Sequence, residues 1–399
     1  MEDNFSLEVK HIPKELKFIL EIIKKEDVKE LQSYLKEWLK DIDWNLFLEL
    51  TIHHRVYPLL LGKLKMIDQS LIPANVMKSI TNLYKLNTLQ MLHFSCEMEQ
   101  VCKMFDKHQI RLLVLKGPVL GEDLYGDISR RTSGDLDFLI SIKDMDKVNE
   151  LLLKNGYKKD DYIKTVLNDW RWRHHHVTYY HTQKKIKLEI HWRLNPGPGL
   201  EPTFNELWAR RRISSITSFP VYYLGREDLF LFLVSHGARH GWSRLRWLID
   251  IDKLVKQRID WIKLARLLTK YQFNYVGGQA LVLASQILSM SITKEMTTII
   301  KGNHPKRLAQ GAIFYLERMV NLHNEPVPDE IAKYHKRYLF LLMSNKQKVL
   351  FIMSFLYPYP EDAETLPLPK LLHFLYFPLR PFLWAWRKTM KHALLQGER

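Results

Sequence analysis

The sequence predicts an α+β protein in which one small mixed sheet lies between helical N-terminal and C-terminal regions. The length of 399 residues suits two or three domains at about 150 residues each. Apolar residues recur at helical spacing up to about residue 108 and again after residue 202. Short apolar runs bounded by turn residues are confined to the stretch between them. We therefore expect a helical region over 1–108, a sheet-containing unit over 109–200 and a helical domain with a basic aromatic tail over 201–399.

Composition limits the class of protein. Sixty Lys and Arg against 44 Asp and Glu leave a net charge of +16, which favours a polyanionic partner such as a nucleotide, a nucleic acid, an anionic glycan or a membrane surface. Cys96 and Cys102 form no CxxC motif, so we expect neither a disulfide framework nor a cysteine zinc site. The longest apolar stretch, 349–360, is shorter than the ~20 residues of a spanning helix. The N-terminus lacks the pattern of a secretory signal, so we expect a cytoplasmic protein without a transmembrane segment.

Each element of the central unit has its own pattern. The run RLLVLK at 111–116 predicts a buried strand that Gly117 and Pro118 end in a turn. A second apolar run at 136–142 predicts the next strand, and two later runs joined by polar residues predict an antiparallel hairpin. The expected hairpin strands lie around 176–180 and 186–192, and the expected helices include 74–108, 144–155, 228–240, 245–257, 262–272 and 308–321.

Three carboxylates fall at positions where they can share one face of this sheet. Alternate residues of a strand project to the same side, so Asp135 and Asp137 point together while Leu136 enters the core. Glu189 lies on a later strand with apolar neighbours on the opposite face. Carboxylates this close repel one another unless a cation lies between them, and Mg²⁺ prefers oxygen ligands. A pair of aspartates at this spacing is common at strand ends, but with a third acid the pattern suits a Mg²⁺ or Mn²⁺ site for phosphoryl transfer.

Several sequence blocks resemble the uncharacterised bacterial nucleotidyltransferase family of the DNA polymerase beta-like nucleotidyltransferase superfamily. The most specific block is LKGPVLGEDLYGDISRRTSGDLDFLI at 115–140. Further blocks are HHRVYPLLLGKL at 53–64, LEIHW at 188–192 and HGARHGWSRLRWLIDIDKL at 236–254, so the resemblance covers about residues 45–255. It implies that the sheet-containing unit is a nucleotidyltransferase catalytic unit. It also implies that Asp135, Asp137 and Glu189 are its metal-binding catalytic residues, with Glu189 completing the site or helping to deprotonate the attacking group.

The same resemblance implies how the nucleotide is held. Lys116 and the backbone of Gly117 would hold the triphosphate, because a Gly turn lets amide groups approach phosphate oxygens closely. Arg131 would neutralise phosphate charge. In the wider superfamily a Ser usually follows this Gly, whereas Pro118 stands here, so the phosphate contact of that hydroxyl falls to Lys116.

Histidines near the acids have two explanations each. His191 shares the strand face of Glu189 and is expected either to contact phosphate or acceptor or to anchor the sheet. His174, His175 and His176 are consecutive, and consecutive residues of a strand cannot all point one way. For these three we expect structural or surface roles.

A polar stripe is predicted in the C-terminal region. His236, His240 and Arg244 have i, i+4, i+8 spacing, which on one helix would place them in line. We expect this stripe to line the substrate cleft. The alternative is a buried brace in which Asp250 pairs with Arg246 or Arg244.

The tail at 369–399 mixes six Lys and Arg with Trp and Phe and contains one Glu. We expect it to fold onto the helical domain; contact with an anionic membrane or a nucleic acid is the alternative. Pro378 and Pro381 are expected to interrupt a continuous amphipathic helix.

These features together predict metal-dependent transfer of a nucleotidyl group from an NTP such as ATP to an acceptor hydroxyl, with release of pyrophosphate. The acceptor is left open among a small molecule, a sugar, a peptide, a protein and an RNA end. A nucleic-acid-binding or nucleotide-sensing protein on the same fold without turnover is the alternative. The sequence lacks the motifs of the common RNA-binding and zinc-finger modules, and it retains all three acids, which a sensor without turnover would not need. The Gly-rich loop and HRD block of a kinase are absent.

Overall fold

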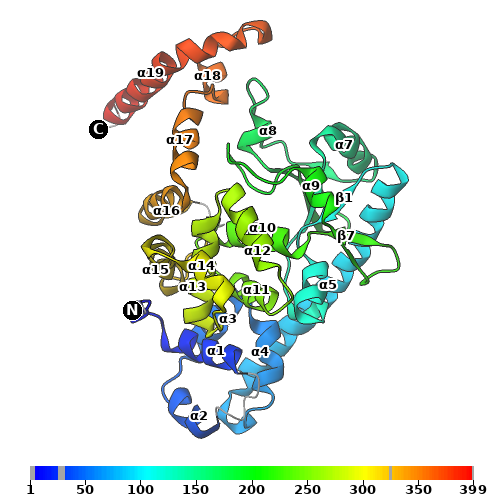
Figure 1. The fold of residues 1–399 in the computed structure, drawn as a ribbon, viewed down its shortest axis with the longest axis vertical. Helices are drawn as coiled ribbons and strands as arrows, with labels where there is room; N and C mark the ends of the chain where they lie inside the picture. The colour runs from blue at the N-terminus through cyan, green and yellow to red at the C-terminus, as the bar shows by residue number, and fades with distance from the viewer. Residues whose placement is uncertain (1–4, 26–31, 323–325, 398–399) are drawn as a thin grey trace.

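A seven-stranded mixed sheet with helices on both of its faces forms the centre of the computed structural model, which describes residues 5–25, 32–322 and 326–397 (Figure 1). The predicted α+β class, with helical regions before and after the sheet, is confirmed. None of the described helices combines the length and the apolar character needed to cross a membrane.

Aspartate side chains cap the start of two of the described helices in the N-terminal region. The side chain of Asp43, for example, accepts hydrogen bonds from the backbone N–H groups of Asn45 and Leu46 (2.9 and 3.1 Å) and so starts one helix. The helices of this region are α1 (Lys14–Lys24), α2 (Gln32–Leu39), α3 (Trp44–His53), α4 (Tyr57–Leu64), the 3-10 helix η2 (Gln69–Leu71) and the long α5 (Ala74–Lys107).

The sheet has the strand order β3-β4-β5-β2-β1-β7-β6. Its two central acid-bearing strands, β2 and β5, are parallel, whereas β4 is antiparallel to β5 and β1 is antiparallel to β2. The strands are β1 (Leu112–Val114), β2 (Leu136–Ile140), β3 (Lys158–Lys159), β4 (His176–His181), β5 (Ile186–His191), β6 (Arg212–Ser214) and β7 (Val221–Tyr223). The helices between them are α6 (Pro118–Tyr125), η3 (Ile128–Arg130), η4 (Ile142–Asp144), α7 (Met145–Lys154), α8 (Trp170–Arg173) and α9 (Phe204–Ala209).

The sheet is longer than the sequence patterns indicated. Strands β6 and β7 have three residues each and lie in the stretch expected to be helical, and β7 pairs in parallel with β1 at Val114 and Tyr223. Runs this short carry too few residues for an alternating pattern to stand out. The sheet therefore continues past residue 200, and the domain boundaries stay a prediction.

The two faces of the sheet belong to two hydrophobic cores. On one face, alternate strand residues such as Leu136, Phe138 and Leu188 pack with the second half of α5 and with α7. Leu113, Leu115 and Leu139 point to the other face and join a larger core. That larger core unites α1, α3, α4 and the first half of α5 with the helices that follow the sheet. The N-terminal and C-terminal helical regions thus share one interior, and α5 runs through both cores (Figure 1).

The C-terminal helices divide into a body and a projecting arm. The body contains α10 (Arg226–Arg239), α11 (Leu245–Val255), α12 (Trp261–Lys270), α13 (Asn274–Leu288), α14 (Lys294–Ile300), α15 (Asn303–Glu317) and α16 (Asp329–Leu342). The arm contains α17 (Asn345–Ser354), α18 (Pro360–Thr365), η5 (Lys370–Leu375) and α19 (Tyr376–Gly397) and extends away from the body (Figure 1).

The tail does not fold onto the helical domain as expected. Helix α19 packs against α18 and η5, and Arg380 and Arg387 both donate to the buried carboxylate of Asp362 (each 2.6 Å). The expected interruption at the prolines is also wrong. Pro378 lies in the first turn of α19, where no amide is needed, and Pro381 lies inside the helix.

Candidate active site

Parallel pairing of β2 with β5 places Asp137 directly opposite Glu189. Directly paired residues of neighbouring strands project to the same face, so the two carboxylates lie side by side. Asp135 directly precedes β2 and His191 ends β5, each two residues from one of the paired acids, so both share that face. The structure therefore brings together the three predicted acids and His191 on the side of the sheet that faces the C-terminal helices.

The carboxylate of Asp137 is fully buried. Its Oδ1 forms an ion pair with Lys116 Nζ (3.0 Å) and accepts a hydrogen bond from the Nε2–H of His191 (3.2 Å). Burial raises the pKa of Asp137, but Lys116 and the His191 hydrogen bond outweigh burial and leave this pKa below its usual value. The other oxygen, Oδ2, is buried and has no hydrogen-bond partner among the described residues.

The other two acids share Lys187. Its Nζ lies 2.7 Å from Glu189 Oε1 and 3.7 Å from Asp135 Oδ2. Burial raises the pKa of Glu189, yet His191, His176 and Lys116 lower it further than burial raises it, so Glu189 is ionised. Burial and the neighbouring charge of Asp137 raise the pKa of Asp135.

This group of side chains suits a divalent cation. One ligand atom from each of Asp137, Glu189 and His191 can be chosen so that all lie within 4.8 Å of one another. The unpartnered Asp137 Oδ2 gives the set a carboxylate oxygen that no protein donor occupies. Oxygen donors from carboxylates are the ligands that Mg²⁺ and Mn²⁺ prefer. A cation here would compete with the ammonium groups that now balance the acids.

Lys116 reaches Asp137 because β1 ends in a turn. Gly117 has φ +83°, a left-handed conformation that side chains disfavour, and a Cβ there would lie 3.3 Å from Leu136 Cδ2. Helix α6 then begins at Pro118, whose missing N–H costs nothing at a helix start. The Nζ of Lys116 lies 5.9 Å from the centre of the Phe232 ring on α10, so Lys116 is held between the acids and that helix.

Arg131 is paired within the protein through its Nε and Nη2, whereas its Nη1 is buried with no partner among the described residues. Its guanidinium is buried and pairs with Asp250 on α11 through three N···O distances of 3.0 to 3.2 Å. The hydroxyl of Tyr125, at the end of α6, donates to the same carboxylate (2.7 Å). The brace expected around Asp250 therefore exists, but its partner is Arg131 and not Arg246 or Arg244. Arg246 instead donates to the carbonyl and hydroxyl of Thr132.

The predicted stripe does not lie on one helix. Helix α10 ends at Arg239, and the chain turns through Gly241 and Trp242, both with positive φ, before α11 starts at Leu245. The sequence pattern could not reveal this turn. The 3.6-residue spacing continues through it, and a tryptophan such as Trp242 seldom adopts the left-handed conformation that the turn requires.

The stripe residues nevertheless lie near the acid-bearing face. The rings of His236 and His240 are 4.7 Å apart. Burial, followed by the charge of Lys116, lowers the pKa of His236 well below its usual value. Burial lowers the pKa of Arg244 to about 10, and the charge of Asp135 opposes this shift. His236 therefore lies close enough to Lys116, and Arg244 close enough to Asp135, for these charges to shift their pKa values.

Three further residues lie near the acids: His176, for which a structural or surface role was expected, and Lys187 and Arg55, which the motif analysis missed. His176 is paired with His191 across β4 and β5, and its Nε2 lies 3.8 Å from Glu189 Oε2. Burial lowers the pKa of His176 to about 4. Lys187 and Arg55 supply positive charge beside Asp135. The register of the predicted hairpin could have placed His176 beside the acids, and the two-residue period of the strand could have placed Lys187 there. Only the tertiary fold brings Arg55 to this face.

A family model described as uncharacterised nucleotidyltransferase matches residues 40–289, which is more than half of the chain. The chain belongs to this nucleotidyltransferase family. The predicted family resemblance is confirmed. No curated protein matches the chain. A solved structure described as an antigenic nucleotidyltransferase-like protein from Paracoccidioides brasiliensis is similar over 52% of this chain and 96% of that chain, with 14% sequence identity and a TM-score of 0.30.

The buried pair of Arg131 and Asp250 gives a stability prediction for this member of the family. Asp250→Asn removes one partner and leaves the other charge buried, so we expect the free energy of unfolding to fall by about 3–5 kcal/mol. Asp252→Asn is the matched control. Asp252 lies on the same helix and pairs with Lys256, which is 60% exposed, so its loss should cost no more than about 1 kcal/mol. Urea unfolding of both variants measures the difference, and equal losses would show that the buried pair does not brace the fold.

Proposed function

We propose that the protein transfers a nucleotidyl group from an NTP to an acceptor hydroxyl in a reaction that depends on Mg²⁺ or Mn²⁺. The observation that carries this proposal is the buried Asp137 carboxylate with one unpartnered oxygen, opposite Glu189 and beside a lysine at a glycine turn. Membership of a nucleotidyltransferase family makes this chemistry the expected use of such a site.

Asp135, Asp137 and Glu189 would hold the metal. When bound, it supplies positive charge that polarises the phosphate and the acceptor oxygen. Lys116 and the amides at Gly117 would bind the triphosphate from the β1 side. Because Arg131 is tied to Asp250, we assign it a positioning role and propose Arg244 and Arg55 for the neutralisation of phosphate charge.

The reaction joins the acceptor oxygen to the α-phosphorus and breaks the bond from that phosphorus to the oxygen that bridges it to the β-phosphorus. Pyrophosphate leaves with the electron pair of this broken bond. The proton of the acceptor hydroxyl moves to a nearby base. We propose Glu189, or the His176 imidazole whose Nε2 lies 3.8 Å from Glu189 Oε2, as that base. Lys116 would balance charge on the departing pyrophosphate.

The test is transfer of an α-³²P-labelled NTP to components of a cell extract. Wild-type protein with Mg²⁺ should label an acceptor, and Asp137→Asn should reduce labelling at least 100-fold while it retains the wild-type melting temperature within a few degrees. Asp146→Asn, an exposed carboxylate on α7 across the sheet, is the matched control and should label normally. Normal labelling by Asp137→Asn would contradict the metal assignment. Tight RNA binding with no labelling by any form would favour the nucleic-acid-binding alternative.

The arm offers a surface for an anionic partner, and we infer that this partner is a lipid bilayer. Phe382, Trp386 and Met390 are spaced one turn apart on α19 and are 73%, 63% and 50% exposed. The opposite face is tied to Asp362 through Arg380 and Arg387. The stretch 366–397 has five Lys and Arg and no acid. An outward apolar stripe among cations is typical of helices that lie in an anionic membrane surface.

Vesicle flotation tests the membrane contact. Full-length protein should float with vesicles of phosphatidylcholine and phosphatidylserine more than with phosphatidylcholine alone. The double substitution Phe382→Ser with Trp386→Ser should reduce flotation at least 10-fold, because two aromatic side chains no longer enter the interface. Ile262→Ser, on the body and 67% exposed before substitution, should have no effect. The inference fails if the double variant floats like wild type, or if single-stranded RNA binds the arm and vesicles do not.

A further inference from the structure

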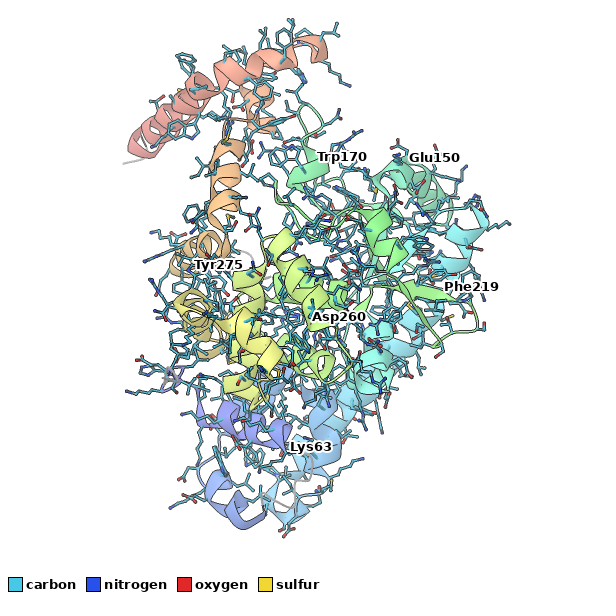
Figure 2. The ribbon with its side chains drawn as sticks, in the orientation of Figure 1. Lys63, Glu150, Trp170, Phe219, Asp260 and Tyr275 are labelled. Carbon is cyan, nitrogen blue, oxygen red and sulfur yellow. The ribbon has the colours of Figure 1, made fainter. Side chains whose placement is uncertain are left out.

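A cavity of about 640 Å³ lies between the body and the base of the arm. Residues of α10, α13, α16 and α17 line it together with α8 and the loop 193–201 (Figure 1). Trp170, labelled in Figure 2, shows where α8 lies on the body. From the same helix, Arg173 donates hydrogen bonds to the carbonyls of Tyr357 and Pro358 in the arm (3.2 and 3.3 Å). Much of the wall is apolar, with Trp172, Phe273, Leu342 and Phe351 among its residues. This volume is typical of a site that holds a small molecule.

One cation in the cavity differs from the others. Arg239 lies at the end of α10, and within the described ranges no ion pair or hydrogen bond of its side chain is observed. Its Nε is buried without a partner. The other three cations of the wall each have an anionic partner: Lys164 with Glu364 (2.6 Å), Arg173 with Asp169 (2.6 Å) and Arg193 with Glu201 (3.1 Å).

Arg239 is partly buried with its Nε enclosed, and Glu201, the first acid that favours its charged form, already pairs with Arg193, so two guanidinium groups share one carboxylate on this wall. An excess of positive charge in a largely apolar cavity suits an anionic ligand. Burial lowers the pKa of Arg239 to about 10, which still leaves it charged at neutral pH. The ligand group that this arrangement recognises is an anion, and a guanidinium pairs best with a planar carboxylate or with a phosphate.

The position of Arg239 connects the cavity with the acids. Helix α10 passes Lys116 at Phe232 and reaches Arg239 two turns later, where the charge of Glu201 and, less strongly, that of Glu189 raise the pKa of Arg239 against the effect of burial. In the sheet, β5 and β2 with the acids lie between β1, which leads to the phosphate turn, and β4, which follows the cavity-lining α8. The acids thus separate the proposed triphosphate position from the cavity. An acceptor and a leaving pyrophosphate need such opposite sides for in-line displacement.

We propose that this cavity binds the acceptor of the nucleotidyl transfer, and that the acceptor is a molecule with an apolar body and an anionic group that pairs with Arg239. The assignment of the ligand as acceptor rests on the proposed function. The binding of an apolar anion in the cavity does not depend on turnover and can be tested without it.

Calorimetric titration without nucleotide or metal tests the site. The probes are decanoate and decyltrimethylammonium, which have the same chain and opposite charges. Decanoate should bind wild-type protein at least 10-fold more tightly than decyltrimethylammonium. Arg239→Gln should weaken decanoate binding by about 10- to 100-fold, the size expected for a lost charge-assisted contact, whereas Arg239→Lys should retain most of it.

Arg226→Gln is the matched control, since Arg226 lies at the other end of α10 and bonds to Gln257 (3.1 Å). It should leave decanoate binding unchanged. A second variant, Met343→Trp, reduces the volume of the cavity without changing charge and should also weaken decanoate. The proposal is overturned if wild-type protein binds both probes equally or if decanoate binds Arg239→Gln as it binds wild type. Loss of probe binding with labelling intact would reject only the acceptor site, and probe binding without labelling would reject only the proposed function.

Discussion

Complete burial of the Asp137 carboxylate is the constraint on which the rest of the site depends. A buried anion is tolerated only when cations and hydrogen-bond donors surround it. Lys116 at the end of β1 and His191 at the end of β5 provide them, and both approach the same oxygen. The second oxygen is buried and has no hydrogen-bond partner among the described residues. A metal and a phosphate chain would supply the contacts to this carboxylate that the protein alone does not provide.

The architecture holds this carboxylate from two directions. Behind the sheet, α5 and α7 pack on the apolar residues that alternate with the acids. In front, the pair of Arg131 and Asp250 fixes the loop that leads into β2 against α11, and Tyr125 ties α6 to the same point. Arg131 precedes Asp135 by only four residues, so this pair lies close to the start of the acid-bearing strand.

Local patterns predicted the parts of the molecule that depend on local rules. The two-residue period of strands placed Asp135, Asp137 and Glu189 on one face, and the helical period identified most helices of the body. The family block tied these acids to nucleotidyl transfer, and their individual roles stay a prediction. The pair of Arg131 and Asp250 spans 119 residues, so no local pattern could reveal it.

Other misses have different physical causes. The turn at Trp242 depends on a left-handed backbone that only tertiary contacts enforce. The outward aromatic stripe of α19 looks like core to any periodicity argument, because spacing cannot tell which side faces solvent. The cavity lies between segments more than 100 residues apart, and its unpaired arginine is visible only in three dimensions.

Thermal unfolding with Mg²⁺ and a non-hydrolysable NTP tests the central claim most directly, since a ligand that binds only the folded protein raises the melting temperature. We expect metal and nucleotide together to raise the midpoint of thermal unfolding by more than the sum of their separate effects. We also expect Lys116→Ala to lose the effect of the nucleotide and Asp137→Asn to lose the effects of both ligands. No shift in wild-type protein, or an unchanged joint shift in Asp137→Asn, would contradict the claim that this carboxylate organises a metal and nucleotide site.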